Sequence, residues 1–208
     1  MFDVDGTLVK SYEFDEQCFI AAVSQILGHD IDSNWNGYRH VTDSGILSEH
    51  LERKNIHSDH EEIHQEVKAY FIKKVKDHLS QNPVSEIPGA NAFITKLKEL
   101  DSVGLSIATG GWKETAMLKL ESAGIEVSGI PLASSNDHYS RTEIMKIAMG
   151  KANVKSHHQL TYFGDALWDK LACSELGYNF ILVGGRIEHD KSVEDLENIN
   201  QVLSLIGL

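Results

Sequence analysis

The sequence predicts an α/β protein, with a Rossmann-like parallel-sheet core and a small all-helical unit inserted after the first strand. From Glu13 to about Gln81, apolar residues recur at helical spacing, and this stretch contains no convincing strand. After Pro88, short apolar runs alternate with amphipathic helices, which is typical of a parallel sheet covered on both faces. We therefore expect residues 1–11 and 86–208 to form the α/β core and residues 12–85 to form the helical insertion.

The first strand carries two aspartates. The chain opens with MFDVDGTLVK, where Asp3 and Asp5 stand two residues apart before the turn-prone pair Gly6-Thr7. Residues i and i+2 of a strand point to the same side, so both carboxyls should emerge together at this turn. Only two residues precede Asp3, so this strand is either unusually short or preceded by residues outside this numbering.

Two amphipathic stripes lie in the insertion. The first ends at Gly28 and contains Phe14, Cys18, Phe19, Ala22 and Ile26. The second contains Ile63, Val67, Tyr70, Phe71 and Val75. The two cysteines, Cys18 and Cys173, match no paired metal-ligand spacing, and we expect both to be reduced, buried thiols.

The core is expected to alternate helices with strands. Helices are predicted over about 89–101, 113–123, 141–152, 166–176 and 192–205. Strands are predicted over about 104–108, 130–133, 159–163 and 178–183. Three of these strands end in polar or glycine-rich tips, which are Thr109-Gly110-Gly111, Gly164-Asp165 and Gly184-Gly185. In an open α/β sheet the ligand site lies outside the carboxyl ends of the strands, so these tips mark the expected site.

The strand tips also bring carboxylates together. Asp3 and Asp5 end the first strand, Asp165 ends a later one, and Asp169 follows about one helical turn on. Carboxylates crowded within a few ångströms need a cation between them, and hard oxygen ligands select Mg²⁺ over zinc. One carboxylate could then attack an electrophile that the metal orients, as phosphoryl transfer requires. We therefore predict a magnesium site at this edge of the sheet.

The composition limits the partners. With 31 acidic and 19 basic residues the formal net charge is -12, and no Lys/Arg run is long enough to follow a nucleic-acid backbone. No segment approaches the about 18 apolar residues of a membrane span or has the pattern of a signal peptide. We expect a soluble cytoplasmic protein with no nucleic-acid or membrane partner. An acidic protein that handles an anion must invert the local field with a metal ion or a few placed cations.

Three motifs in order resemble those of a known family. The string Asp3-Val-Asp5-Gly6-Thr7 resembles the first motif (DxDGT) of the haloacid dehalogenase-like (HAD) phosphohydrolase superfamily. Thr109 after an apolar strand resembles the second motif, and the stretch from Gly164 to Asp169 resembles the fourth (GDxxxD). The resemblance covers the whole chain and implies a HAD fold with a C1-type helical cap. It is nearest to the phosphoglycolate phosphatase-like branch.

The resemblance implies a role for the first two motifs. Asp3 would be the nucleophile that forms an aspartyl-phosphate, and it would also ligate Mg²⁺. Asp5 would protonate the leaving oxygen and then activate water, while its backbone carbonyl ligates the metal. Thr109 and the amide of Gly110 would bind the phosphoryl oxygens.

The remaining motifs would supply metal ligands and a cation. By resemblance, Asp165 would be the last protein ligand of Mg²⁺, and Asp169 would support it from a second layer or through water. The third motif is usually a lysine, and two cations, Arg141 and Lys146, compete for this role. We favour Arg141 because helix starts face the site, whereas Lys146 lies inside the same predicted helix. Arginine supplies the same charge with a fixed fork of donors, so activity should survive the exchange.

Substrate recognition must come from the insertion and from the loop after Thr109. Gly111-Trp112 places a large aromatic near the site, where it either stacks on the substrate or packs beneath the cap. Arg39 and His40 lie in a polar connection of the insertion. They would either recognise a second anionic group of the substrate or be ordinary surface residues.

The sequence therefore predicts a Mg²⁺-dependent phosphatase. It would hydrolyse a small, phosphoglycolate- or sugar-phosphate-like phosphomonoester through an aspartyl-phosphate, as a monomer or homodimer. A phosphomutase shares every motif and is kept as an alternative, as is a non-catalytic protein that binds a metal or a partner. His60-Glu-Glu-Ile-His64 fits the zinc-peptidase pattern H-E-x-x-H, but no third ligand has a recognisable setting, and we favour a solvated helix face.

Overall fold

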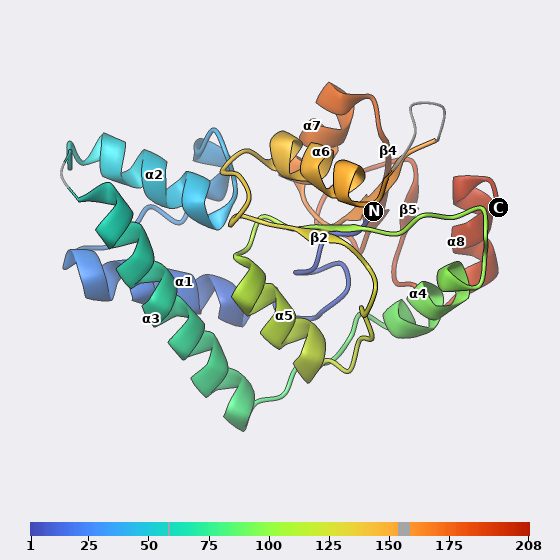
Figure 1. The fold of residues 1–208 in the computed structure, drawn as a ribbon, viewed down its shortest axis with the longest axis horizontal. Coiled ribbons are helices and arrows are strands. Elements are labelled where there is room, and N and C mark those ends of the chain that lie inside the picture. Colours follow the sequence, from blue (N-terminus) through green and yellow to red (C-terminus); the bar gives the residue numbers. More distant parts are fainter. Residues whose placement is uncertain (58, 154–158) are drawn as a thin grey trace.

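The computed structural model of the chain describes residues 1–57, 59–153 and 159–208 (Figure 1). Its parallel strands are β1 (Ile107–Ala108), β2 (Leu132–Ala133), β3 (Thr161–Gly164), β4 (Asn179–Val183) and β5 (Ser192–Val193). β1 pairs with β2, and β4 lies between β3 and β5. Phe2 joins the two halves because it bridges in parallel to both Ile107 and Phe163. The predicted first strand is therefore central, although it consists of isolated bridges only.

Helices cover both faces of these strands. In the core they are α4 (Ala90–Lys98), α5 (Lys113–Ser122), α6 (Arg141–Lys151), α7 (Leu167–Leu176) and α8 (Ile199–Ile206). Figure 1 shows α6 and α7 on one side of the strands and α4 and α5 on the other. None of the helices in the described residues is long and apolar enough to cross a membrane. The predicted α/β class is confirmed.

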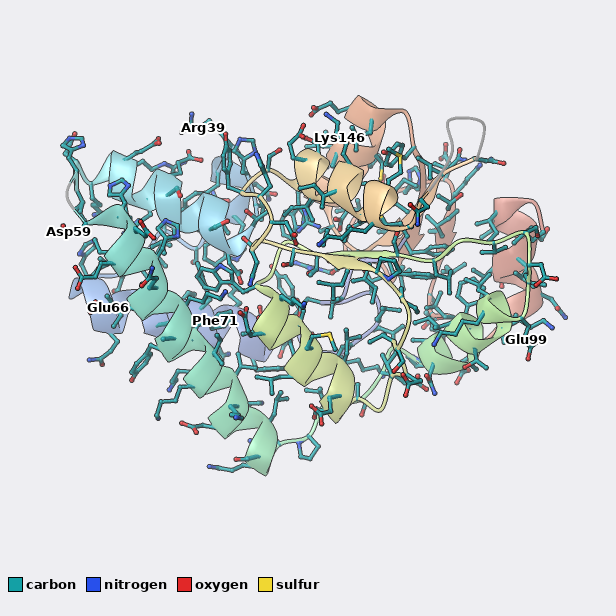
Figure 2. The ribbon with its side chains drawn as sticks, in the orientation of Figure 1. Arg39, Asp59, Glu66, Phe71, Glu99 and Lys146 are labelled. Carbon is teal, nitrogen blue, oxygen red and sulfur yellow. The ribbon has the colours of Figure 1, made fainter. Side chains whose placement is uncertain are left out.

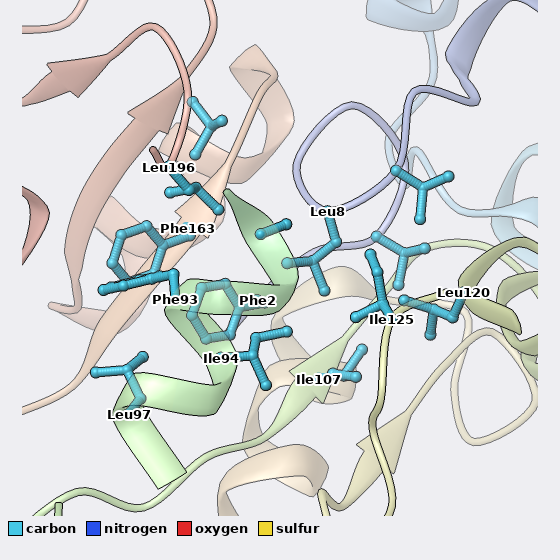
Figure 3. Close-up of a cluster of buried hydrophobic side chains, with 14 of the residues drawn as sticks. Phe2, Leu8, Phe93, Ile94, Leu97, Ile107, Leu120, Ile125, Phe163 and Leu196 are labelled. Carbon is cyan, nitrogen blue, oxygen red and sulfur yellow. The ribbon is translucent and has the colours of Figure 1, made fainter. Parts of the chain in front are cut away.

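Alternate strand residues supply the two halves of the core. The side toward α4, α5 and α8 buries Phe2, Ile107, Phe163, Ile181 and Val183. The side toward α6 and α7 buries Ala108, Tyr162, Phe180 and Leu182. The rings of Phe2 and Phe163 stack with centroids 4.7 Å apart, and Phe93 meets Phe163 edge-on at 5.6 Å (Figure 3). This packing fixes the segment that leads directly into Asp3.

The helical insertion, called the cap below, consists of α1 (Tyr12–Leu27), α2 (Asp43–Arg53), α3 (His60–Gln81) and a short 3₁₀ turn (Trp35–Gly37). α1 ends where Gly28 adopts a left-handed conformation (φ 72°), as the stripe predicted. The pattern had not indicated α2, which begins when the Thr42 hydroxyl accepts a hydrogen bond from the Gly45 amide at 3.0 Å. The cap has its own apolar core, separate from the two beside the strands.

The C-terminal segment differs from the predicted helix over 192–205. Its first residues form β5, which pairs with the end of β4, and α8 begins only at Ile199. The Asn198 side chain sets this start by accepting a hydrogen bond from the Gln201 amide at 3.2 Å. Pairing with an existing strand here outweighs a helical pattern, because local propensity is a weak preference. β1 is likewise shorter than the predicted 104–108.

Candidate active site

Three buried aspartates gather at the carboxyl ends of the strands. Asp3, Asp165 and Asp169 each offer a carboxylate oxygen, and these oxygens all lie within 4.8 Å of one another. Asp3 follows the central Phe2, while Asp165 and Asp169 flank the turn from β3 into α7. Gly6 makes the close approach possible, since its φ is 74° and a side chain there would overlap the Asp165 carboxyl. The structure thus brings together three of the four predicted metal-ligand residues through their side chains.

This cluster has an excess of negative charge. Burial, reinforced by the Asp169 carboxyl, raises the pKa of Asp3 to about 7. Burial also raises the pKa of Asp165 to about 6 and that of Asp169 to about 6. One oxygen of Asp3 is buried and has no hydrogen-bond partner among the described residues. A set of hard carboxylate oxygens with one unpaired suits a divalent cation such as Mg²⁺.

Arg141 supplies positive charge beside this cluster. It is the first residue of α6, and its guanidinium lies 2.7 Å from Asp169 and 3.7 Å from Asp3. Burial lowers the pKa of Arg141, but the Asp169 and Asp3 carboxylates more than offset this and leave it above its usual range. Lys146, the other candidate for this role, pairs with Glu143 on the exposed side of α6 (Figure 2). Arg141 therefore lies at the cluster and Lys146 does not.

The loop after β1 lies against this cation. Thr109 is buried, its amide donates to the Ala133 carbonyl at 3.1 Å, and its hydroxyl accepts from the Gly111 amide at 3.2 Å. A Cβ at Gly110 would overlap the Arg141 guanidinium, so a side chain there requires the arginine to move. Both Thr109 and Gly110 line the same cavity as Asp3. The loop that carries the predicted second motif therefore lines the cavity together with Asp3.

Asp5 lies apart from the three-aspartate cluster and is held by a lysine that sequence reasoning missed. Lys119 of α5 is fully buried, and its ammonium lies 2.7 Å from Asp5 and 2.7 Å from Asp15 of the cap. The Ser11 hydroxyl also donates to Asp5. Burial lowers the pKa of Lys119, but the two carboxylates more than offset this, so the ammonium stays charged. A signal was available, because Lys119 lies between Ala116 and Leu120 on the apolar face of its helix.

A second missed residue is Arg186, in the loop after β4. Its guanidinium lies 2.6 Å from Asp165 and 3.5 Å from the centre of the Tyr12 ring in α1. Arg186 follows directly on the glycine-rich tip of β4, so the rule that strand ends carry the site could have indicated it. It links the aspartate cluster to the start of the cap.

The start of α2 is docked on the core loops. The Thr42 hydroxyl donates to the Tyr139 carbonyl at 2.6 Å, and the hydroxyls of Ser44 and Ser135 lie 2.6 Å apart. The Trp112 amide donates to the Asp43 carboxyl at 2.8 Å. Arg141 donates to the Val41 carbonyl, just before α2, at 3.2 Å. Burial, together with the nearby Asp15, raises the pKa of Asp43. The cap is thereby seated over the aspartates.

A cavity of about 90 Å³ lies between the cap and the core. From the core it is lined by Asp3, Asp5, Thr109, Gly110, Gly111, Arg141, Asp165 and Trp168. From the cap it is lined by Tyr12, Asp15, Glu16, Phe19, Trp35, Val41, Thr42, Asp43 and Ile46. Most of the predicted site residues thus line one cavity, which is partly open to solvent.

Other predicted residues lie outside this cavity. Trp112 is buried against Phe19 and Phe71 in the apolar core of the cap, so it packs beneath the cap. Arg39 is at the rim of the cap, with its side chain 67% exposed and paired to Glu52 (Figure 2). His40 lines a neighbouring groove together with Arg39.

The zinc-peptidase pattern in α3 forms no site in the residues that the structure describes. His64 contacts the Ser48 hydroxyl at 3.1 Å, and His60 contacts the Ile56 carbonyl. Within residues 1–57, 59–153 and 159–208, the one group of three or more potential ligands is the aspartate cluster. The H-E-x-x-H pattern is thus a surface feature of the cap.

The fold and the site together define an α/β protein whose helical cap lies over a buried acidic cluster. The chain belongs to the haloacid dehalogenase-like hydrolases, since the sequence pattern of that family matches residues 1–183. The predicted family resemblance is therefore confirmed. A comparison with curated proteins found no match.

Several solved structures have a similar fold. A hydrolase from Pseudomonas syringae superposes with a TM-score of 0.77 at 19% identity, covering 100% of this chain and 98% of that one. A β-phosphoglucomutase from Clostridium difficile gives 0.73 at 16% identity, covering 98% and 94%. CbbY from Rhodobacter sphaeroides, solved with phosphate, gives 0.71 at 17% identity, covering 95% and 94%. At these identities the likeness concerns the fold.

Proposed function

We propose that this protein is a Mg²⁺-dependent phosphatase that hydrolyses a small phosphomonoester through an aspartyl-phosphate on Asp3. The observation that supports this most directly is the Asp3 carboxyl, which is buried, has one unpaired oxygen and lines the cavity beside Thr109 and Arg141. A carboxylate in that position can attack a phosphorus atom held in the cavity. Membership of the hydrolase family agrees with this reading.

The surrounding residues suit each part of the reaction. Thr109, the Gly110 amide and Arg141 would bind phosphoryl oxygens and stabilise the charge that develops on them. Mg²⁺ held by Asp3, Asp165 and Asp169, with the Asp5 carbonyl, would neutralise phosphoryl charge. The Asp5 carboxyl would protonate the leaving oxygen and then take a proton from the attacking water.

The decisive experiment is hydrolysis of p-nitrophenyl phosphate with Mg²⁺, with Zn²⁺ and with EDTA. The wild-type protein should hydrolyse this substrate with Mg²⁺ but not with Zn²⁺ or EDTA, and Asp3→Asn should be inactive under all three conditions. Asp190→Asn, a change of the same chemistry at an exposed loop position, should retain wild-type activity. Activity that persists in Asp3→Asn would rule out the proposed nucleophile.

A phosphomutase is the second candidate, and the seated cap favours it, because retaining a phosphoryl group requires that water be kept out. The test is to supply a hexose 1-phosphate with a catalytic amount of the corresponding bisphosphate. Conversion to the 6-phosphate without release of inorganic phosphate would identify a mutase. Release of phosphate at the same rate as substrate loss would identify a phosphatase.

A further inference from the structure

The cap side of the cavity carries acidic groups and no basic ones. Asp15 and Glu16 of α1 and Asp43 of α2 line it. Within the part of the chain that the structure describes, Arg141 is the one lysine or arginine among the lining residues, and Asp169 already engages it. Two further cations lie just behind the lining residues, but Lys119 is engaged by Asp5 and Asp15, and Arg186 is engaged by Asp165. A second anionic group on the leaving alcohol would therefore meet carboxyl groups, while the nearby cations of the described residues already have carboxylate partners.

The three cap carboxyls differ in their engagement. Asp15 is paired with the Lys119 ammonium at 2.7 Å, and Asp43 accepts the Trp112 amide at 2.8 Å. The half-buried Glu16 side chain makes no hydrogen bond or ion pair with any other described residue. Glu16 is therefore the carboxyl that is available to accept a hydrogen bond from a bound molecule.

Aromatic side chains of the cap and of the core also line the cavity, and the cavity is small. The rings of Tyr12, Phe19, Trp35 and Trp168 line the same space, and such faces suit both C–H groups and cations. A water needs about 10–15 Å³ of such volume, so a cavity of about 90 Å³ holds roughly six to nine groups of that size. Beside a phosphoryl group this space accommodates a short alcohol, whereas a longer one would extend through the open side of the cavity.

We infer that the substrate is the phosphomonoester of a short alcohol that carries a hydroxyl or ammonium group, and no second anion, at the end facing Glu16. This inference rests on the proposed phosphatase function, because it assigns the far end of the same cavity to the leaving alcohol. It excludes phosphoglycolate and small bisphosphates as preferred substrates. Arg39, which the sequence offered for a second anion, lies outside the cavity.

Three phosphomonoesters with the same two-carbon chain test this directly. Phosphoethanolamine, 2-hydroxyethyl phosphate and phosphoglycolate differ only in a terminal ammonium, hydroxyl or carboxylate. We expect kcat/KM for either of the first two to exceed that for phosphoglycolate by roughly tenfold or more, since one like charge within a few ångströms costs at least that much. A preference for phosphoglycolate, or equal rates, would overturn the inference.

Substitutions of Glu16 test whether this side chain causes the substrate selectivity. Glu16→Lys should raise kcat/KM for phosphoglycolate relative to phosphoethanolamine by roughly tenfold or more, and Glu16→Gln should have an intermediate effect. Glu13→Gln, an exposed glutamate in the first turn of the same helix, should leave the ratio unchanged. A ratio that responds equally to the Glu13 and Glu16 changes would show that the cavity wall does not select the substrate.

A binding measurement separates this inference from the proposed function. The three compounds are titrated calorimetrically into Asp3→Asn protein with Mg²⁺, where no turnover is needed. If p-nitrophenyl phosphate is not hydrolysed by the wild type, yet the compounds bind in the expected order, the proposed function fails and the selectivity stands. Tightest binding of phosphoglycolate, or no binding of any of the three, would overturn the selectivity.

Discussion

Lys119 forms a salt bridge with both carboxylate oxygens of Asp5, since its ammonium nitrogen lies 2.6 Å from one oxygen and 2.7 Å from the other. The same nitrogen reaches Asp15 of the cap, so one buried cation joins α5, the loop after Asp3 and the first cap helix. A residue in this position sets where the proposed acid–base group points.

Replacing Lys119 should therefore destabilise the fold. Lys119→Met leaves Asp5 and Asp15 facing each other without a cation, and removing one partner of a buried pair costs about 3–5 kcal/mol. Urea denaturation should show this loss, and Lys119→Met with Asp15→Asn should recover part of it. Lys113→Met, an exposed lysine in the same helix, should stay within about 0.5 kcal/mol of wild type. Equal stability of the two lysine variants would contradict a structural role for the pair.

Lys119→Met should also reduce activity toward some substrates more than toward others. If Lys119 positions Asp5, kcat/KM of Lys119→Met should fall further for an alkyl phosphate than for p-nitrophenyl phosphate, because only the alkoxide needs a proton as it leaves. A merely unstable protein would lose both activities in the same proportion. The measurement is the ratio of the two kcat/KM values at a temperature where both proteins are folded.

Arg141 and Lys146 can be separated by substitution within α6. Arg141→Met should reduce kcat/KM for p-nitrophenyl phosphate by about 100-fold or more, the usual effect of removing a group that stabilises developing charge. Arg141→Lys should lose only about tenfold, because the charge remains while the fork of donors is lost. Lys146→Met should behave as wild type. A larger loss for Lys146→Met than for Arg141→Met would reverse the assignment.

Gly110→Ala should reduce activity more than stability. The new methyl would overlap the end of the Arg141 side chain, which is flexible and can move aside, and it would touch the Val41 carbonyl at 3.0 Å. We expect kcat/KM to fall about tenfold or more, while the melting temperature changes by a few degrees at most. Gly104→Ala, where nothing lies within 4 Å, is the control and should retain activity.

The cap should lose stability in mild acid because of one histidine. Burial, reinforced by the neighbouring His29, lowers the pKa of His50 from 6.5 to about 4. Between these values the unfolded chain binds a proton that the folded chain does not, so the free energy of unfolding falls as the pH drops from about 6.5 toward 4. The full effect is on the order of 3 kcal/mol.

Denaturation of variants across this pH range isolates the histidine. His50→Gln should remove this part of the pH dependence, whereas His57→Gln, at an exposed position, should keep it. Other groups titrate in both variants, so the difference between their curves is the quantity to compare. Parallel curves for the two variants would show that His50 is not the acid-sensitive group.

The sequence was most informative at the short motifs that carry the candidate site residues. Asp3, Thr109 and Asp165 follow strands, and parallel strands bring their carboxyl ends to one edge, so their convergence could be predicted without knowing any side-chain packing. Lys119 illustrates the limit. A lysine inside a helix usually extends to solvent. Its place between Ala116 and Leu120 hints at burial, but its partners Asp5 and Asp15, which make that burial possible, lie 114 and 104 residues away in the sequence.

Tertiary contacts decide the features that the sequence pattern predicted wrongly or left open. β5 forms because the end of β4 offers it a partner, and the start of α2 is fixed by contacts with core loops far away in the sequence. Trp112 was equally compatible with a substrate contact and with packing, and the cap core around Phe19 and Phe71 decides for packing. These outcomes depend on neighbours that no local window contains.

The burial of Trp112 has a consequence for how substrate and product exchange. Its ring belongs to the cap core, but its backbone continues the loop that begins at Thr109, and its amide is bonded to Asp43. The loop is held on the core as well, because β1 and α5 flank it and the Ser135 amide donates to the Gly111 carbonyl at 3.1 Å. Stripping a buried indole from its neighbours costs roughly 4–6 kcal/mol. Trp112 therefore ties the cap to the core, and any opening that separated the two to exchange substrate and product would have to expose this ring.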